Sequence, residues 1–461
     1  MNISGNNMKI QNHTQSLKHG FLTYLASTSL IALSGCQTLT PPSITPPKST
    51  SAKQASIYHT HALRAQRIEA ALQNLVDKGI VPGISMIMYE DGKEVFYAEK
   101  GYSDLAEKTP QSREDVARYF SMTKPIVGAA LMTLYEDGRF KLDDPIAKYM
   151  PEYADTQVYV SVNADGSLKT APVKRPITIR DIMRHTAGMT YGVFTDTPVD
   201  KAYRKANIFS NARTLAEFSK TMGALPLLNH PGEIWTYSLA VDVQGRLIEV
   251  LSGQTLGEYL TQTIFNPLNM THTGFTVKAA DAKRLASAYL LIMDNDKPEL
   301  KLLTDENTQQ MTVGSMHAIN DEYLTPKTLQ RGGSGLVSTI DDYANFLKMI
   351  SSGGKANGKR ILKPETIALM SKDHLGTIDN GTLEDDMGFG LNYSIKLRNS
   401  DGPKSIPVPI GTYSWGGLAS TLFWVDPKND IFVVVQTQVI NMVNADIRKS
   451  IAKSVYIKDI K

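Results

Sequence analysis

The sequence predicts an α+β fold in which helices flank an antiparallel sheet built from both chain ends, with a mostly helical domain inserted between those ends. Two hairpin patterns support the sheet. Residues 84–101 place two runs rich in Ile, Met, Val, Phe and Tyr around Glu90-Asp91-Gly92-Lys93, and Thr421–Val425 and Ile431–Gln438 flank a polar turn near the other end. The helical part follows from apolar periodicity, which predicts helices over 121–136, 179–184, 213–221, 240–251, 256–263, 340–350 and 444–456. Strands at both ends with helices between them favour one discontinuous sheet domain.

The predicted organisation has four parts. Residues 1–35 are a lipoprotein signal peptide, and residues 36–56 are a Pro/Ser/Thr-rich tether. Residues 57–138 and 331–461 together form the sheet domain, and residues 139–330 form the inserted helical domain.

The signal peptide is predicted from charge and hydropathy. Residues 1–35 contain no Asp or Glu, carry Lys9 and Lys18 early, and continue into the apolar run 21–33, which is shorter than the roughly 20 residues of a spanning helix. Leu33-Ser34-Gly35-Cys36 resembles a bacterial lipobox, which implies that Cys36 is acylated. With Gln37 after the cysteine, the resemblance implies a lipid-anchored envelope protein of the outer membrane facing the periplasm. A plain signal peptide with an incidental cysteine is the alternative.

Composition excludes several classes of protein. The chain has 461 residues, 42% of them hydrophobic and 21% charged, as in globular domains. Its net charge is 49 − 46 = +3, or about +1 without the two leader lysines, so bulk charge gives no reason to expect a nucleic-acid partner. A single cysteine excludes an intrachain disulfide, a cysteine-ligated zinc ribbon and C-x-x-C redox chemistry.

The pattern S-x-x-K occurs at Ser121/Lys124, Ser352/Lys355 and Ser450/Lys453. The second lies in a Gly-rich loop, and the third lies inside the closing helix. Only Ser121 begins a strongly apolar helix, which has Pro125 in its first turn. A serine at a helix N-terminus lies near unpaired N–H groups that favour an oxyanion, and Lys124 follows one turn later on the same face. These residues predict a serine hydrolase that uses no histidine base.

The S-x-x-K motif resembles the first motif of the serine β-lactamase and penicillin-binding protein superfamily. The chain is most similar to the class C β-lactamase-like branch and to family VIII carboxylesterases. Further segments resemble that branch in the family order, over about residues 60–440: 178–189 (TIRDIMRHTAGM), 231–238 (PGEIWTYS), 265–270 (FNPLNM) and 332–339 (GGSGLVST). The resemblance implies a β-lactamase/transpeptidase-like fold.

The resemblance also assigns the other site residues. Tyr237 is the implied general base and acid of the second motif, Y-x-N, whose asparagine is replaced by Leu239. The third motif, K-T-G or H-x-G on a core strand, corresponds to Trp415-Gly416-Gly417. The backbone N–H groups of Ser121 and Leu418 would form the oxyanion hole. Trp415, Gly416, Gly417 and Leu239 are expected to contact the substrate.

Two other matches to these motifs are expected to be structural. Tyr343-Ala344-Asn345 spells Y-x-N inside a helix, and we expect Tyr343 to pack in the core. His272-Thr273-Gly274 spells H-x-G but follows Tyr237 too soon. His185 is expected to support the fold, and Trp235 is expected to pack in the core.

The departures from the family motifs favour an esterase. Leu239 and Trp415 cannot supply the amide and ammonium contacts that β-lactam-active relatives use, whereas an indole forms an apolar wall suited to neutral groups. We therefore expect a carboxylesterase that acts on small ester or acyl substrates through a Ser-Lys-Tyr acyl-enzyme and needs no metal or organic cofactor. A β-lactamase or D-alanyl-D-alanine carboxypeptidase is the first alternative, and a non-catalytic envelope binding protein is the second.

Two other hydrolase classes lack their motifs. His59-Thr60-His61 is an H-x-H without the further ligands of a zinc hydrolase, and H-E-x-x-H is absent from the sequence. The G-x-S-x-G motif of α/β-hydrolases is absent as well.

Overall fold

The computed structural model describes residues 52–208, 210–304, 322–400, 402, 405–441 and 447–456. Cys36, the predicted signal peptide and most of the predicted tether lie outside these residues. Residues 56–461 cluster as one compact unit, so the predicted boundaries at 138/139 and 330/331 stay predictions. None of the described helices is both long enough and apolar enough to cross a membrane.

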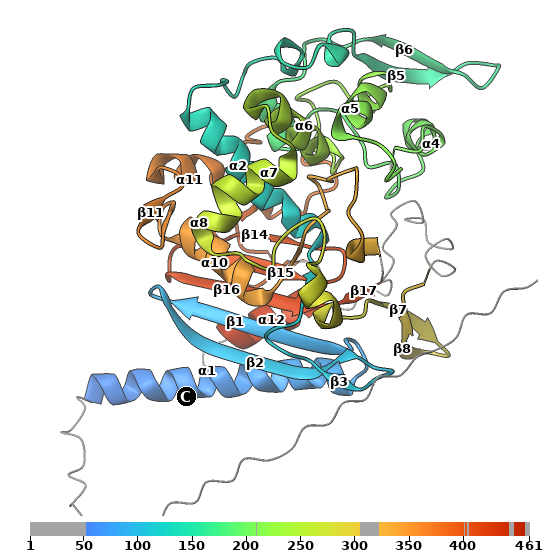
Figure 1. The fold of residues 1–461 in the computed structure, drawn as a ribbon. Coiled ribbons are helices and arrows are strands. Elements are labelled where there is room, and N and C mark those ends of the chain that lie inside the picture. The colour runs from blue at the N-terminus through green and yellow to red at the C-terminus, as the bar shows by residue number, and fades with distance from the viewer. Residues whose placement is uncertain are drawn as a thin grey trace, which may run out of the picture. The chain divides into compact units, whose positions relative to one another are not determined.

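An eight-stranded antiparallel sheet joins the two chain ends, which confirms the predicted fold class (Figure 1). Strand β1 pairs with β16, and Ile87 lies opposite Val434. The strands follow one another across the sheet in this order: β12 (Met387–Phe389), β13 (Ser394–Lys396), β14 (Tyr413–Gly416), β15 (Leu422–Asp426), β16 (Ile431–Thr437), β1 (Gly83–Glu90), β2 (Lys93–Asp104) and β3 (Thr109–Pro110).

Apolar side chains pack on both faces of this sheet. Side chains alternate between the faces along a strand, so Ile87 and Val434 join one apolar cluster while Met86 and Val433 join another. Every residue of β16 is buried, which explains why residues 431–435 form an unbroken apolar run rather than an alternating one. The sheet is therefore the central layer of its domain.

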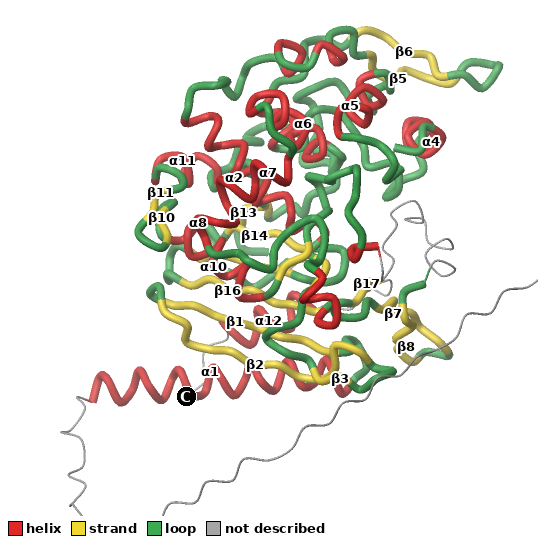
Figure 2. Tube along the Cα trace, in the orientation of Figure 1, coloured by secondary structure: helices red, strands yellow, loops and turns green. Residues whose placement is uncertain are grey.

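The helices lie on both sides of the sheet and in the inserted part of the chain, where Figure 2 shows mostly helices and loops. The described helices are α1 (Ala52–Asp77), α2 (Thr123–Glu136), α3 (Ile179–Met183), α4 (Pro198–Lys205), α5 (Leu215–Gly223), α6 (Ala240–Ser252), α7 (Leu256–Leu260), α8 (Asn266–Leu268), α10 (Ile340–Ser351), α11 (Pro364–Met370) and α12 (Ile447–Tyr456). Helices α1 and α12 contribute to the apolar cluster on one face of the sheet, and α2 and α10 contribute to the cluster on the other.

The first helix differs from the sequence prediction. It begins at Ala52, inside the range predicted as a tether, and runs to Asp77. Its second half buries Ile68 and Leu72 against the sheet. The sequence did not predict this start, because the preceding residues are rich in Pro, Ser and Thr. The amphipathic pattern can be recognised only where the helix packs on the core.

Threonine caps fix several helix starts in the inserted part. Helices α3, α4, α5 and α7 each begin with a capping box, in which a threonine side chain and an Asp or Glu at the third helical position exchange hydrogen bonds with the backbone. The predicted start at residue 213 was therefore wrong, because Thr214 is the cap and the helix begins at Leu215.

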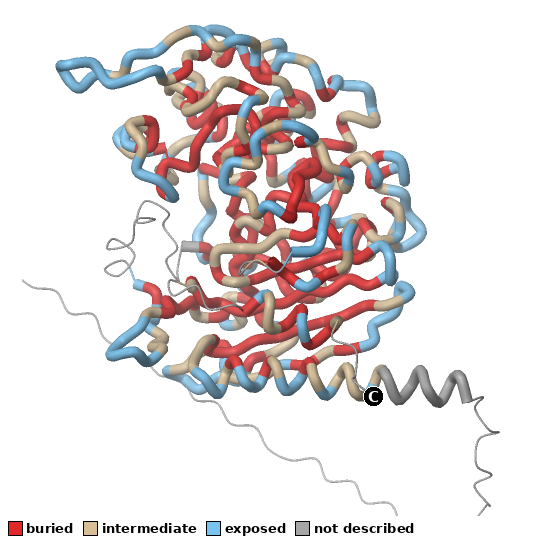
Figure 3. The backbone as a smooth tube through the Cα atoms, turned by 180° about the vertical axis from the view of Figure 1, so that it is seen from behind, coloured by how far each residue is buried: buried red, intermediate tan, exposed pale blue. Residues whose placement is uncertain are grey.

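The structure also contains strand pairs outside the main sheet that apolar periodicity did not predict. Strands β5 (Gln157–Val162) and β6 (Leu168–Pro172) form a projecting hairpin that is largely exposed (Figure 3). Strands β7 (Tyr289–Asp294), β8 (Lys297–Leu302) and β17 (Val439–Asn441) form a small sheet. The remaining short pairs are β4 (Ala117–Arg118) with β9 (Val337–Ser338), and β10 (Lys355–Ala356) with β11 (Lys359–Arg360).

Candidate active site

Ser121 lies in a tight turn that leads directly into α2. The turn spans Phe120–Met122, and Phe120 has a φ of +42°, a left-handed conformation that is unfavourable for a bulky residue. The side chain of Phe120 is buried, so packing holds this strained backbone in place. The turn sets Ser121 at the start of an almost fully buried helix while leaving the serine itself partly exposed to a cavity.

The hydroxyl of Ser121 meets an amine and a phenol. Lys124 Nζ lies 3.1 Å from Ser121 Oγ, and the Tyr237 hydroxyl donates to the same oxygen at 2.6 Å. Tyr237 lies in the loop between α5 and α6, more than a hundred residues from the serine in sequence. The structure thus brings together the three side chains that the motifs single out.

Backbone contacts hold Lys124 in place. Its ammonium group donates to the carbonyl of Gly333 at 2.7 Å, and the N–H of Gly333 donates to Asp242 Oδ1 at 3.1 Å. A β-carbon on Gly333 would lie 2.6 Å from Asp242 Oδ2, so a larger residue here would displace the Asp242 carboxylate. The segment 332–339, noticed in the sequence only as a family likeness, therefore positions the amine.

Burial determines the protonation states at the site. Lys124 is 1% exposed, and desolvation lowers its pKa to about 7, although the carboxylate of Asp242 opposes this effect. Burial raises the pKa of Tyr237 well above its usual value, and the neighbouring Tyr191 raises it further. These pKa shifts favour Lys124 over Tyr237 as the resting base, although the family resemblance implies that Tyr237 is the general base. Near neutral pH the phenol stays protonated, and the amine is the group that changes charge.

A second phenol lies beside the first. Tyr191 is fully buried, its hydroxyl lies 3.5 Å from Lys124 Nζ, and its ring stacks on that of Tyr237 at 5.2 Å. Hydrogen bonds with Ser121 and Ser334 counteract the strong rise that burial causes in the pKa of Tyr191. Sequence reasoning missed this residue. The only available signal was its position two residues after the 178–189 segment.

Strand β14 brings the third motif to the same place. Trp415, Gly416, Gly417 and Leu418 all line a cavity of about 390 Å³ that also contains Ser121 and Tyr237. A β-carbon on Gly417 would lie 2.4 Å from the carbonyl oxygen of Tyr119, two residues before the serine. The glycine thus lets the end of the strand approach the turn that carries Ser121, and Leu418 lines the same cavity as this serine.

Aromatic rings form much of the remaining cavity wall. Phe194, Trp235, Tyr237 and Trp415 line it, with Leu383 and the charged side chains of Glu384 and Arg448. Trp235 is 3% exposed, as a core residue would be, but it lines the cavity as well, so the expectation of core packing alone was incomplete. Neither Phe194 nor Arg448 belongs to a motif that the sequence could have revealed.

Leu239 lies outside the cavity. Its side chain is fully buried in the apolar core at the start of α6, and it is absent from the lining. The expectation that this residue contacts substrate is therefore wrong. In this chain the position that carries asparagine in the family motif serves packing.

His185 is buried beside Tyr237, and its ring pairs with Ser238 rather than with the Ser121 hydroxyl. Its Nδ1 lies 3.1 Å from the Ser238 hydroxyl, its backbone carbonyl accepts from Thr236 N at 2.9 Å, and its ring lies 5.1 Å from that of Tyr237. Burial lowers the pKa of His185 well below its usual value. These contacts agree with the fold-supporting role expected for it.

The other motif matches lie away from the site. Tyr343 is fully buried and donates to the Met122 carbonyl at 2.9 Å, as expected of a packing residue. His272 pairs with Asp281 at 2.7 Å. His61 lies 3.8 Å from Glu90, and among the residues that the structure describes there is no cluster of His, Cys, Asp and Glu suited to a metal ion.

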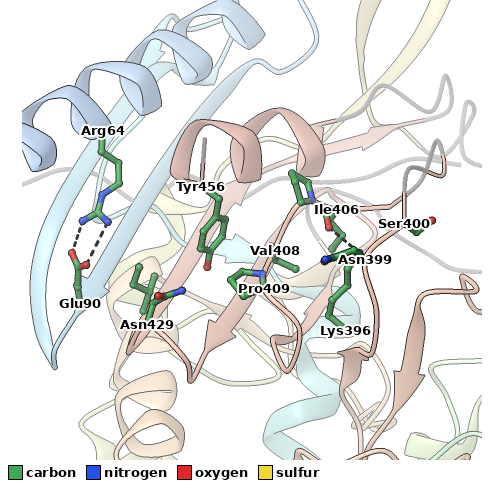
Figure 4. Close-up of a pocket in the computed structure, with 12 residues that line it drawn as sticks. Arg64, Glu90, Lys396, Asn399, Ser400, Ile406, Val408, Pro409, Asn429 and Tyr456 are labelled. Carbon is green, nitrogen blue, oxygen red and sulfur yellow. Dashed lines mark hydrogen bonds and ion pairs between the residues drawn. The ribbon is translucent and has the colours of Figure 1, made fainter. Parts of the chain in front are cut away.

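A second cavity, of about 560 Å³, is lined by residues of α1, α12 and the segment after β13 (Figure 4). Its charged groups are already paired. Arg64 binds Glu90, and the Lys396 ammonium binds Asp386, Ser405 and the Ile406 carbonyl. None of the predicted site residues lines this cavity.

Comparison with known proteins shows the family of the chain. The Beta-lactamase family model matches residues 68–450, so the chain belongs to this family, and the resemblance drawn from the motifs is confirmed. Protein Rv1367c of Mycobacterium tuberculosis is 30% identical over 381 residues, which cover 80% of this chain and 89% of that protein. Esterase EstB of Burkholderia gladioli is 26% identical over 382 residues, which cover 81% and 90%.

Solved structures agree in fold. EstCE1, described as a hydrolase with promiscuous acyltransferase activity, superposes with a TM-score of 0.69 at 25% identity and covers 86% of this chain and 99% of its own. Simvastatin synthase (LovD) from Aspergillus terreus superposes with a TM-score of 0.68 at 20% identity, over 85% and 98% of the two chains. The second likeness shows the fold alone.

Proposed function

We propose that this protein is a carboxylesterase that cleaves small esters through an acyl-enzyme on Ser121. The observation that carries the proposal is the convergence of Lys124 and Tyr237 on the Ser121 hydroxyl, at 3.1 and 2.6 Å, at the edge of a cavity that is partly walled by aromatic rings. The names of two relatives, esterase EstB and the lovastatin esterase of Penicillium rubens, support the same activity.

In the first half of the reaction, the neutral Lys124 amine accepts the proton of Ser121 as its oxygen attacks the ester carbonyl carbon. The backbone N–H groups of Ser121 and Leu418 donate to the oxyanion that forms. The bond to the alcohol oxygen then breaks. The Tyr237 hydroxyl gives its proton to the departing alcohol and regains one from the lysine ammonium.

In the second half, water attacks the acyl-enzyme. The Lys124 amine accepts a proton from the water, the bond between carbonyl carbon and Ser121 oxygen breaks, and the serine is reprotonated through Tyr237. An amine with a pKa near 7 can take and return a proton at neutral pH, which an ordinary lysine does poorly.

The test is hydrolysis of a short-chain nitrophenyl ester compared with hydrolysis of a chromogenic cephalosporin. We expect a far larger kcat/KM for the ester, and we expect Ser121→Ala to abolish it while circular dichroism stays unchanged. Ser352→Ala is the matched control, because Ser352 begins an S-x-x-K outside the cavity. Full activity in Ser121→Ala would overturn the proposal.

One observation favours a second function. Arg448 lines the cavity, and its guanidinium would lie 2.8 Å from a β-carbon on Gly416, so it stands beside the third motif. A cation there suits a substrate carboxylate such as that of a β-lactam or a D-peptide. A larger kcat/KM for the cephalosporin than for the ester, with a strong loss in Arg448→Ala, would establish this alternative.

The location in the cell is a further part of the proposal. Cys36 and the apolar run before it support a lipid-anchored protein of the bacterial envelope, in the outer membrane and facing the periplasm. Metabolic labelling with palmitate should mark the wild-type protein and not Cys36→Ser. Equal labelling of both would exclude Cys36 as the anchor.

A further inference from the structure

Phe194 is an exposed aromatic side chain at the cavity. It is 49% exposed, and among the described phenylalanines and tryptophans it alone falls in the exposed class. An aromatic ring left half in water costs free energy that burial would recover, so its placement at a cavity points to a ligand that covers it.

The loop that carries Phe194 is held by one buried carboxylate. Asp200 is fully buried and accepts hydrogen bonds from the hydroxyls of Thr190 and Thr195, both at 2.5 Å, and from the backbone and hydroxyl of Thr197 at 2.9 and 2.7 Å. These donors lie on both sides of Phe194. Hydrogen bonding lowers the pKa of Asp200 although burial opposes it, so the anchor is charged at neutral pH.

An arginine closes the same loop from outside. Arg204 on α4 donates to the Gly192 carbonyl at 2.6 Å and binds the carboxylate of Asp196. Gly192 has a φ of +82°, and a β-carbon there would lie 3.0 Å from the β-carbon of Tyr203. Arg204 thus contacts the chain on both sides of Phe194, at the Gly192 carbonyl and at the Asp196 carboxylate, which helps to hold the loop that carries the ring.

The ring of Phe194 packs on both phenols of the site. Its centroid lies 5.0 Å from that of Tyr191 and 5.8 Å from that of Tyr237. In the proposed reaction, Tyr237 gives its proton to the departing alcohol, so the alcohol part of the ester lies next to Tyr237. Phe194 lines the same cavity and packs against Tyr237, so its exposed side is available to that part of the substrate.

We propose that Phe194 is the specificity-determining contact for the alcohol part of the substrate, and that the preferred esters carry an apolar alcohol such as a benzyl or long alkyl group. This inference rests on the proposed esterase function. The inference extends the proposed function, because it separates selectivity for the alcohol part of the ester from selectivity for the acid part.

The test measures the rate at which acid is released from two series of esters. In the first, acetate is esterified with ethanol, hexanol or benzyl alcohol. In the second, ethanol is esterified with acetate, butyrate or hexanoate. Phe194→Ala should lower the kcat/KM ratio of benzyl to ethyl acetate about five- to tenfold, and Phe194→Leu should lower it less. The ratio along the acid series should stay constant in both variants. Met293→Ala is the matched control, because Met293 on β7 is equally exposed, at 49%, and lies outside the cavity.

Two results would overturn the inference alone. One is Ser121-dependent ester hydrolysis with an alcohol ratio that Phe194→Ala leaves unchanged. The other is an equal fall in both ratios, which would mean that the variant disturbs Tyr237 rather than a substrate contact. Absence of Ser121-dependent hydrolysis in the wild type would instead overturn the proposed function, and this inference with it.

Discussion

The buried amine of Lys124 predicts how the reaction depends on pH. Its pKa is about 7, and the proposed mechanism uses the neutral form. The neutral fraction rises from about one in eleven at pH 6 to about ten in eleven at pH 8, whereas a lysine at the usual value of 10.5 would be about 0.3% neutral at pH 8. The acidic limb of kcat/KM should therefore have its midpoint near pH 7, with activity gained as pH rises through it.

The midpoint of this acidic limb should also shift when the charge of the neighbouring Asp242 is removed. The Asp242 carboxylate raises the pKa of Lys124, so Asp242→Asn should shift the midpoint below pH 7. Asparagine keeps a side-chain oxygen that can accept the hydrogen bond from Gly333 N. In the wild type, Asp242 Oδ1 accepts this bond at 3.1 Å. Asp341→Asn is the control variant. Asp341 lies on α10, and its carboxylate pairs with Arg113 at 2.7 Å.

The assay is kcat/KM for an activated ester between about pH 5 and pH 9, a parameter that reports ionisations of the free enzyme. A midpoint near 10 would show that the amine is not desolvated as the structure indicates. A midpoint near 7 that Asp242→Asn leaves unmoved would assign the limb to another group. Either result would refute the proposed role of the Lys124 amine.

Three further predictions follow from the same geometry. Tyr237→Phe keeps the ring but removes the hydroxyl that donates to Ser121 at 2.6 Å, so kcat should fall about 10²- to 10⁴-fold in steady-state assays while thermal melting is unchanged. Gly333→Ala would place a β-carbon 2.6 Å from Asp242 Oδ2, and it should lower both kcat and the melting temperature, with a loss of about 1–3 kcal/mol in urea unfolding. Asp181 is fully buried and binds two arginines, so Asp181→Ala should cost about 2–4 kcal/mol by the same measurement. The pKa of Asp181 is lowered to about 2, so the stability from this residue is present above its unfolded value near 4 and lost as pH falls through 2. A free energy of unfolding equal to that of the wild type, in Gly333→Ala or in Asp181→Ala, would contradict the prediction for that variant.

The sheet and the proximity of Ser121 to Lys124 could be predicted because their signals are local. Hairpin turns at 90–93 and 426–430 identify β1, β2, β15 and β16, and pairing across the two chain ends follows from their apolar strands. Ser121 and Lys124 lie one helical turn apart, so a short motif places them together. Tyr237 needed the family likeness, since no local rule relates residues more than a hundred positions apart.

The cavity walls could not be predicted, because they come from loops whose conformation depends on tertiary contacts. Tyr191 and Phe194 are placed by the carboxylate of Asp200, which sequence spacing marks only as a helix cap. Leu239 was assigned to the substrate by motif position, yet the start of α6 turns it into the core. Motif position identifies the chain segment, and local backbone geometry then decides where its side chain points.

Covalent labelling with a fluorophosphonate tests most directly the claim that Ser121 is the nucleophile. The reagent modifies the nucleophile itself, so the natural ester need not be known. Peptide mapping of the labelled wild-type protein should place the modification on Ser121, and Lys124→Ala should react far more slowly in a folded state. A label on Ser238 or Ser334, or equal rates for the wild type and Lys124→Ala, would contradict the proposed chemistry.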